Sequence, residues 1–594
     1  MTGADGAATP LDDLRAAVIG AAREVGGEAG TLVLERPRRE QFGDYSTNAA
    51  LLIAPGLGLA PRELAERLGD AVQARLRGSI ERFEVAGPGF LNLFVSDAWL
   101  LDALAHVLAA GAGFGVGARH APERVLVEFV SANPTGPVHV GHARNAVYGD
   151  ALARMLALQG HAVTREFYVN DAGSQVRRLG ESIRAVARGE PVPEDGYKGE
   201  YVLALSAGID GAAERDPLEL GHAAVAIVLD GVRRSLAAFG VEDFDHWFFE
   251  STLHEGDPSP LEHTLALLER EGHTYVSEGA LWLRTSELGD DKDRVLVRSS
   301  GEHTYFASDI AYHQDKRERG FQRQIDVWGA DHHGYVRRMK AAYEALGGDP
   351  RELELLIMQL VHLISSGERA QMSKRAGEFV TLDDLVADIG VDAARWYLLA
   401  RSHDTTVDLD LDLAREQSSE NDVYYVQYAH ARIASILAKA GEQRSQQALA
   451  AVLGGGLAEI AGGVGGGAGG GDGGGAGGGD GGGAAAGDRG ATAGGVGGGT
   501  SGGDRLDASE RALIKQILAF PAELTEAAQR RAPHRIVAYV LTLAQTFTSF
   551  YRDCQVVGVE PEAVESRRIA LCVASMRTIA RCLGVLGVSA PTSM

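Results

Sequence analysis

Cysteine is scarce in this chain of 594 residues. Cys554, Cys572 and Cys582 are the only three, and all of them lie near the C-terminus. Because no two of them form a C-x-x-C pair, the sequence supports neither a disulfide framework nor a cysteine-based zinc site. We expect three buried side chains that pack as small apolar groups.

Long hydrophobic runs are missing as well. No stretch of about 18 apolar residues stands out as a membrane span. The N-terminal segment MTGADGAATPLDDLRAAV has neither the basic start nor the apolar core of a secretory signal. With 45% apolar and 23% charged residues, the composition is that of a soluble globular protein. We therefore expect a cytoplasmic protein that does not bind membranes.

The chain is poor in positive charge, since 81 Asp and Glu against 57 Lys and Arg give a net charge of -24. This balance argues against indiscriminate binding to nucleic acid, although it is compatible with a local basic surface. The segment from Arg505 to Met594 is a candidate, with 11 basic against 8 acidic residues and the cluster QRRAPHR at 529–535. The cluster fits a solvated helix end and a face that contacts phosphates equally well.

The chain is too long for one hydrophobic core, and changes in its character predict three domains. Residues 1–118 mix helical and strand-like runs, as in a small α+β domain, and residues 119–392 alternate the two. Residues 393–594 are almost entirely helical, apart from 461–504, where 26 of 44 residues are glycine. Such a composition predicts a flexible, disordered insertion within a helical bundle.

The middle domain begins with the strand-like run ERVLVEFV at 123–130, which leads through a Pro/Gly-rich loop into a helical pattern that ends near Gly160. Further strand-like runs at 294–299, 324–331 and 355–364 alternate with helical segments. This alternation predicts an α/β domain with a mainly parallel, Rossmann-type sheet and helices on both of its faces.

The loop SANPTGPVHVGHARNA, at 131–146, places His139 and His142 three residues apart. A helical zinc pair is normally spaced by four and accompanied by further ligands, so a metal site is disfavoured. Two core histidines remain an alternative. The strand-loop-helix context favours a third reading, because free N–H groups at a helix start bind anions and imidazoles there can donate to phosphate oxygens.

A second loop, RAQMSKRAGEFVTLDDL at 369–385, places Met372, Ser373 and Lys374 before a helix for which Thr381 is a plausible N-cap. A lysine on a loop suits a triphosphate, because its compact ammonium group sits on a long, flexible stem. Taken alone, a lysine in such a loop is usually no more than part of a solvated turn.

Together the two loops resemble the HIGH and KMSKS signatures of the class I aminoacyl-tRNA synthetases. The finer matches resemble the arginyl-tRNA synthetases, and they extend over essentially the whole chain apart from the glycine tract. They are VEFVSANPTGPVHVGHARNA, EHTYFASDIAYH (302–313), VWGADHHGYV (327–336), QMSKRAGEFVTLDDL, NDVYYVQYAHARI (421–433) and the ending LGVLGVSAPTSM.

The resemblance implies that ATP lies across the first loop, with its α-phosphate at His139 and His142 and its adenine over Gly141. Lys374 is expected to hold the departing pyrophosphate. Catalysis would work by positioning and electrostatic stabilisation, because the arginine carboxylate is already a nucleophile. Mg²⁺ is expected on the ATP phosphates, without a dedicated metal site in the protein. The expected ATP-binding residues are His139, Gly141, His142, Gly329, Asp331, His332, Met372, Ser373 and Lys374.

Arginine selection requires carboxylates that face a planar guanidinium. By the resemblance, Asp309 is the first of these, with Tyr305 beside it in a Y-x-x-x-D pattern, and Glu250 is a second. Without the resemblance, Asp309 could instead be a helix N-cap. The α-amino and carboxylate end of arginine is expected to meet Glu128, Ser131, Asn133 and His142.

The resemblance also gives the flanking domains a role in binding tRNA(Arg), the third substrate. The N-terminal domain is expected to contact the elbow of the tRNA, and the C-terminal helices its anticodon. Tyr424, Tyr425, Tyr428 and Arg432 could stack on bases, although a tyrosine row at helical spacing is more often core. We expect a monomer.

Two positions depart from the family pattern. Gln371 stands where the first lysine of the second signature is expected, and Asp422 replaces a proline after Asn421. Gln371 predicts weaker closure of the loop, and it also motivates a rival interpretation, a catalytically silent tRNA-binding relative. Another class I synthetase, or an H-x-G-H nucleotidyltransferase, is the enzymatic alternative.

Overall fold

The computed structural model describes residues 9–27, 32, 34–37, 39–117, 122–369, 380–454 and 505–594. The glycine tract at 461–504, for which the sequence predicts a disordered insertion, lies outside these residues. The N-terminal unit is α+β, as predicted. Its helix α1 (Pro10–Glu24) begins at Thr9, which forms a capping box with Asp12, and Pro10 occupies the first helical position.

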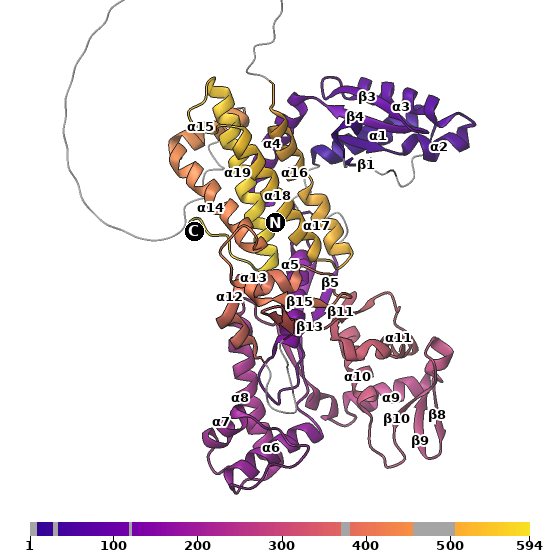
Figure 1. Cartoon of the computed structure of the whole chain (residues 1–594). Helices are drawn as coiled ribbons and strands as arrows, with labels where there is room; N and C mark the ends of the chain where they lie inside the picture. Colours follow the sequence, from indigo (N-terminus) through magenta and orange to yellow (C-terminus); the bar gives the residue numbers. More distant parts are fainter. Residues whose placement is uncertain are drawn as a thin grey trace, which may run out of the picture.

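A four-stranded antiparallel sheet of order β1-β2-β4-β3 completes this unit, and Figure 1 shows it set apart from the rest of the molecule. The next helix, α4 (Asp97–Ala110), leaves it and packs against α15, α16 and α19 of the C-terminal domain. The other elements of the unit are β1 (Leu34–Glu35), β2 (Tyr45–Thr47), α2 (Ala49–Leu57), α3 (Pro61–Arg75), β3 (Ile80–Ala86) and β4 (Phe90–Val95).

The middle of the chain forms the predicted parallel sheet, with five strands in the order β12-β11-β5-β6-β7. The central strand β5 continues into helix α5 (Val140–Leu158), which leads back to β6 on one side, while β11 pairs with β5 on the other. A ligand crevice is expected at the carboxyl ends of strands where the strand order reverses in this way. The strands are β5 (Arg124–Glu128), β6 (Ala162–Val169), β7 (His246–Phe249), β11 (Arg323–Gly329) and β12 (Leu353–Met358).

Two of the predicted strands do not join this sheet in the expected way. The run at 294–299 contains β10 (Arg294–Val297), which belongs to a separate antiparallel sheet with β8 (Thr274–Ser277) and β9 (Ala280–Leu283). The two-residue turn between β8 and β9 has positive φ at Glu278 and Gly279, which favours a tight hairpin over a crossover. The alternation of strand-like and helical runs did not reveal this hairpin.

The run at 355–364 is divided between two sheets. It ends β12, and after Gln359 it forms β13 (Val361–Ser365), which pairs with β14 (Glu368–Arg369) and β15 (Val407–Asp410). The break occurs where the N–H of Gln359 donates to the carbonyl of His403 and so leaves the ladder.

Helices inserted between the strands extend the domain. In Figure 1, α6, α7 and α8 form a bundle at the lower end of the molecule, beside the unit that contains β8 to β10. α6 and α8 touch at glycines, because a Cβ on Gly180 would lie 1.7 Å from the carbonyl oxygen of Pro217. These helices are α6 (Ser174–Ala187), α7 (Glu200–Gly208), α8 (Pro217–Ala238), α9 (Pro260–Arg270), α10 (Tyr305–Glu318) and α11 (Val336–Ala345).

The C-terminal part is a helical bundle, as predicted. It begins within α12 (Leu382–Leu399), which changes direction at Gly390, where φ is 78°. The other helices are α13 (Leu411–Arg415), α14 (Asp422–Ala440), α15 (Glu442–Val452), α16 (Ala508–Leu518), α17 (Phe520–Gln529), α18 (His534–Asp553) and α19 (Glu562–Leu586).

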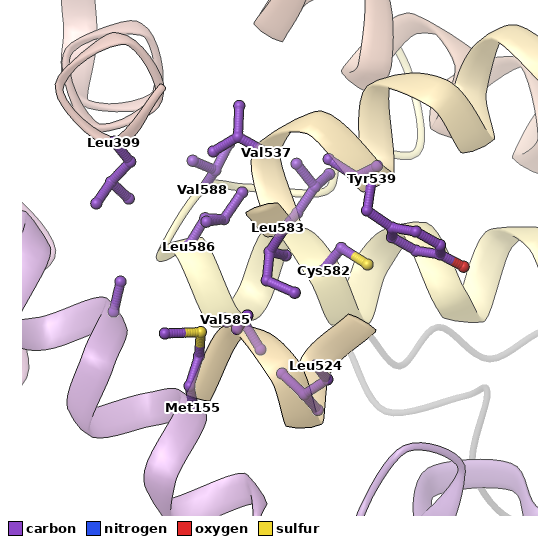
Figure 2. Close-up of a cluster of buried hydrophobic side chains, with 14 of the residues drawn as sticks. Met155, Leu399, Leu524, Val537, Tyr539, Cys582, Leu583, Val585, Leu586 and Val588 are labelled. Atoms are coloured by element: carbon purple, nitrogen blue, oxygen red, sulfur yellow. The ribbon is translucent and has the colours of Figure 1, made fainter. Parts of the chain in front are cut away.

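Helix α19 is the centre of this bundle. Figure 2 shows Cys582, Leu583 and Leu586 of α19 among side chains of several other helices, with Met155 of α5 close to Val585. Cys554, Cys572 and Cys582 are free and buried, as expected. Although α19 is long and apolar enough to cross a membrane, most of it is buried inside the protein, which is the behaviour of a core helix.

The basic cluster at 529–535 joins this bundle to the sheet. Arg531 donates to both carboxylate oxygens of Glu354 on β12, at 2.8 and 2.9 Å, and Arg535 pairs with Glu523 and Glu526. Arg530 is exposed and pairs with Glu526. Arg531 and Arg535 therefore have carboxylate partners within the protein, and contact of the cluster with phosphates stays a prediction.

Candidate active site

The two signature loops meet in the fold. The N–H of Val140 donates to the carbonyl of Val380 at 3.1 Å, and the N–H of Leu382 donates to the carbonyl of Val138 at 2.9 Å. His139 and Thr381 form the antiparallel bridge between these two bonds. Thr381 is the N-cap of α12, as predicted. Gln371, Met372, Ser373 and Lys374 lie outside the described residues, so their roles remain predictions.

His139 and His142 lie at the start of α5, where the sequence places them. His139 is the N-cap, its Nδ1 accepts from the N–H of Gly141 at 3.0 Å, and Nδ1 of His142 accepts from the N–H of His139 at 3.5 Å. The rings are in contact, with centroids 3.9 Å apart and planes tilted by 30°. Because a neutral imidazole that accepts at Nδ1 carries its proton on Nε2, both histidines are set to donate from Nε2.

Gly141 leaves room for the ring of His139. A Cβ at this position would lie 2.8 Å from Cε1 and 2.9 Å from Nδ1 of His139, closer than side-chain atoms normally approach. The glycine therefore allows the His139 ring to fold over the first turn of α5. Its expected contact with adenine stays a prediction, and its exposed position is compatible with that contact.

Gly329 ends β11, the neighbour of β5, and Asp331 and His332 follow it, so all three lie at the same edge of the sheet as the first loop. The side chains of Asp331 and His332 are 82% and 50% exposed and stand 3.2 Å apart, which leaves them accessible to a nucleotide. Among the described residues, no three His, Cys, Asp or Glu side chains group into a metal site.

The loop after β5 begins with a strained turn. Val130 and Ser131 have φ values of 66° and 39°, which are rare for residues with a side chain and rarer still for a β-branched one. Asn145 of α5 stabilises the turn, because it accepts from the N–H of Val130 and donates to the carbonyl of Val327, both at 2.6 Å. The turn is thus fixed to α5 and β11 at once.

Glu128 closes β5 and is buried with partners from within the protein. Its Oε1 accepts from Ser131 at 2.8 Å, and its Oε2 accepts from Lys316 at 2.6 Å. Ser131 in turn accepts from the N–H of Tyr168, at the end of β6. Binding of the arginine amino group by Glu128 and Ser131 remains a prediction, as does the role of Asn133, which is exposed in the same loop.

Glu250 and Asp309 face each other across the same edge of the sheet. Glu250 follows β7 and is 4% exposed, and burial, together with the charge of Asp309, raises its pKa to about 7. Burial likewise raises the pKa of Asp309, whose Oδ2 accepts from Tyr335 at 2.5 Å. Neither carboxylate has a lysine or arginine within ion-pairing distance among the described residues, so an arriving cation would lower both pKa values.

Two tyrosines that sequence reasoning missed lie beside these carboxylates. Burial and the nearby carboxylates of Glu250, Asp309 and Glu128 raise the pKa of Tyr168, and Asp309 acts on Tyr335 in the same direction. Tyr305, the predicted neighbour of Asp309, lies one turn away on α10 and is 56% exposed. The signal for Tyr168 was weak, because β6 was not identified as a strand.

Helix α10 is fastened to the sheet, which fixes the position of Asp309. Its N-cap is Thr304, so the alternative of Asp309 as an N-cap is wrong. Lys316, fully buried, donates to Asp326 of β11 at 2.8 Å in addition to Glu128, and His313 contacts the other oxygen of Asp326, also at 2.8 Å. Tyr312 donates to Glu166 of β6 at 2.7 Å. These contacts tie α10 to three parallel strands.

Comparison with known proteins identifies the family. Residues 12–95 match the arginyl tRNA synthetase N terminal domain, residues 103–186 and 251–434 match the catalytic domain of the class I (R) tRNA synthetases, and residues 498–594 match the DALR anticodon binding domain. The arginine–tRNA ligase of Bacillus subtilis is 38% identical over 98% of each chain, and that of Desulfosudis oleivorans is 42% identical over 94% of each. The chain belongs to the arginyl-tRNA synthetase family.

Solved structures of arginyl-tRNA synthetases share the fold. That of a putative arginyl-tRNA synthetase from Campylobacter jejuni superposes with a TM-score of 0.69 at 33% identity, and covers 84% of this chain and 100% of its own. The Thermus thermophilus enzyme has a TM-score of 0.72 at 23% identity and covers 98% of this chain and 99% of its own. The class I catalytic fold with an N-terminal domain and a helical C-terminal domain is thereby established.

In this member of the arginyl-tRNA synthetase family, the tyrosine row on α14 is divided, because Tyr425 packs against the core whereas Tyr428 lies at the surface. Tyr428 is 44% exposed, Tyr424 stacks on it with ring planes 13° apart, and Arg432 donates to its hydroxyl at 2.9 Å. Arg432 also lies over the ring of Tyr551 on α18. The interpretation of the whole row as core is therefore wrong for Tyr428, and a stacking role stays a prediction.

Proposed function

We propose that this chain activates L-arginine with ATP to arginyl adenylate, and then transfers the arginyl group to the 3′ end of tRNA(Arg). The observation that carries the proposal is the pair of Glu250 and Asp309. Two carboxylates with raised pKa values and without a protein cation are costly to keep ionised, and a guanidinium would relieve both. A lysine ammonium would leave several of the acceptors unpaired, which supports selection against it.

ATP is assigned to the start of α5. The helix N-terminus and the Nε2–H groups of His139 and His142 would stabilise charge that develops on the α-phosphate. Gly329, Asp331 and His332 would line the nucleotide, and Met372, Ser373 and Lys374 would hold the pyrophosphate. Mg²⁺ is expected to accompany ATP on its phosphate oxygens, which it prefers to protein cages.

The chemistry requires no strong protein base in the first step. The arginine carboxylate attacks the α-phosphorus, the bond to the β-phosphate oxygen breaks, and pyrophosphate leaves. A ribose hydroxyl of the terminal adenosine then attacks the carbonyl carbon of the adenylate, and AMP leaves. The protein contributes positioning and electrostatic stabilisation, for which a site on rigid strands and a fixed helix is suited.

The flanking domains would bind tRNA(Arg). The N-terminal unit would reach the elbow, and the helical domain would reach the anticodon with the surface that contains Tyr424, Tyr428 and Arg432. Aromatic faces and an arginine on one surface suit stacking with unpaired bases. We further propose that the enzyme acts as a monomer in the cytoplasm.

Exchange of pyrophosphate into ATP tests the function. We expect exchange with arginine, and not with lysine or other amino acids, once tRNA(Arg) is present. Absence of exchange at any tRNA concentration would favour the silent relative, and exchange with a different amino acid would favour another class I synthetase. Glu250→Gln and Asp309→Asn should each raise the arginine KM far more than the ATP KM.

A further inference from the structure

Asn170 is the first residue after β6, and its side chain has no hydrogen-bond partner among the described residues. Its Oδ1 is buried and unsatisfied, and so is Oε2 of Glu250. Buried acceptors of this kind are uncommon, because each loses its bonds to water without replacement. Two of them at one edge of the sheet point to a ligand that brings donors.

The sheet register places the two acceptors together. β6 and β7 are parallel, and their last pair is Val169 with Phe249, so Asn170 and Glu250 each come next. Earlier pairs establish the common face, since Glu166 contacts His246 at 2.6 Å and Tyr168 stacks on Phe248 with ring planes 13° apart. Side chains alternate along a strand, so Asn170 and Glu250 follow on this face, on strands about 4.8 Å apart.

We propose that Asn170 is a specificity-determining residue, whose Oδ1 accepts a guanidinium N–H of bound arginine beside Glu250. This inference rests on the proposed function. A guanidinium has five N–H donors, and two carboxylates cannot meet all of them in one plane, particularly when Oδ2 of Asp309 already accepts from Tyr335. A neutral amide supplies the extra acceptor without adding a third negative charge beside Glu250 and Asp309.

The unsatisfied Oδ1 of Asn170 predicts that stability and arginine binding respond differently to its replacement. Because no described residue donates to Oδ1 of Asn170 in the protein without ligand, its replacement by alanine should leave the thermal stability unchanged or slightly higher. The same replacement should raise the arginine KM by about 10- to 100-fold, the usual effect of losing a hydrogen bond to a charged group. The KM values for ATP and tRNA should stay unchanged.

Asn170→Asp is the matched variant. It keeps an acceptor oxygen in the same place but removes the amide donor. Its added negative charge is unfavourable beside Glu250 and Asp309 until the guanidinium offsets it, so at about pH 8 its arginine KM should be much closer to that of the wild type than to that of Asn170→Ala. A loss in Asn170→Asp as large as in Asn170→Ala would show that the amide NH₂ matters instead, and would overturn the proposal.

Other outcomes are equally decisive. An unchanged arginine KM in Asn170→Ala, with a wild type that activates arginine, would sink this inference and leave the proposed function intact. A rise in the tRNA KM alone would assign the acceptor to the terminal ribose. A wild type without arginine-dependent exchange would instead be a failure of the proposed function itself.

Discussion

His139 and Thr381 pair as an antiparallel bridge between two loops that are far apart in the sequence. The bridge joins the N-cap of α5 to the N-cap of α12, and backbone hydrogen bonds flank it on both sides. The described base of the second loop is therefore fixed against the histidines. Residues that follow the M-S-K motif are thus fixed beside the proposed site for ATP.

Leu382→Pro tests this connection. Leu382 is the first residue of α12, where proline is tolerated, and Thr381 has an extended backbone that a following proline accepts. The change removes the N–H that donates to Val138. We expect a rise in the ATP KM of about fivefold or more relative to Leu382→Ala, which loses the same buried side chain but keeps the donor.

The ATP KM, measured by pyrophosphate exchange at saturating arginine, decides between the two variants. Equal values for Leu382→Pro and Leu382→Ala would show that the bond from Leu382 to Val138 does not position the site.

Gly141→Ala should displace the ring of His139, because the added Cβ would lie 2.8 Å from Cε1 of that ring. A displacement of about 1 Å at a reacting centre can cost roughly 100-fold in rate. We expect a loss of this order in kcat for arginine activation. Gly208→Ala, at the end of α7 with open space around it, should have wild-type kcat and serves as the control.

The raised pKa of Glu250 predicts a pH dependence of arginine use. The ionised carboxylate binds the guanidinium, and it becomes protonated in the free enzyme as the pH falls through about 7. Below that pH we expect kcat/KM for arginine to fall with falling pH, at most about tenfold per pH unit for this one group. In Glu250→Gln the value should be low and should lack this inflection. An identical profile in both enzymes would contradict the assignment.

The raised pKa of Glu250 also affects stability, but its contribution to stability falls, where arginine use rises, as the pH increases. Since the pKa of Glu250 is higher in the folded state than its ordinary 4.5, the folded protein keeps the proton longer than the unfolded chain. The contribution of Glu250 to the free energy of unfolding therefore declines as the pH rises from about 4.5 to about 7. At pH 8 Glu250→Gln should unfold at higher denaturant concentration than the wild type, whereas at pH 5 the two should be closer.

Lys316→Met should destabilise the protein strongly. Burial lowers the pKa of Lys316, but Asp326 and Glu128 outweigh it and keep the ammonium charged. Its removal would leave two carboxylates buried without a cation, which typically costs about 3–5 kcal/mol. Denaturant unfolding measures the loss, and Lys439→Met, on the exposed surface of α14, should change the free energy of unfolding by less than about 0.5 kcal/mol.

The sequence was sufficient for the class of fold and for the strand, loop and helix around His139, because these are local features. It was insufficient for strands whose partners are far away in the sequence. β6 and β7 contain charged or aromatic residues such as Glu166 and Trp247, whose partners come from α10 and α8, so neither reads as an apolar run. The hairpin of β8 and β9 was missed because its turn chemistry, at Glu278 and Gly279, was overlooked.

For the arginine site, the resemblance supplied Asp309 and Glu250, and the structure brings them together. It could not supply Lys316, Tyr168 or Asn170. Their roles depend on which side chains share a face of the sheet, and a one-residue shift in register would reverse that. Lys316 of α10 donates to Glu128, the residue expected to contact the substrate. No local pattern in the sequence places Lys316 there.

Lys374→Ala should lower the rate of arginine activation far more than Gln371→Lys raises it. The compact ammonium of Lys374 is proposed to follow the leaving pyrophosphate, whereas a lysine at position 371 would add only a second contact. Single-turnover formation of the adenylate measures the step directly. Comparable rates for Lys374→Ala and the wild type would remove the phosphate role from this residue.

Helix α5 connects the proposed ATP site to the helical domain. At 19 residues it is about 28 Å long, and it starts at the two histidines. Along its length Tyr148 donates to the carbonyl of Arg531 in the helical domain, and Met155 packs near Val585 of α19 (Figure 2). The helix is thus anchored in the bundle that would bind the anticodon, and its N-terminus is the proposed ATP site. A tilt of the bundle cannot occur without moving that N-terminus.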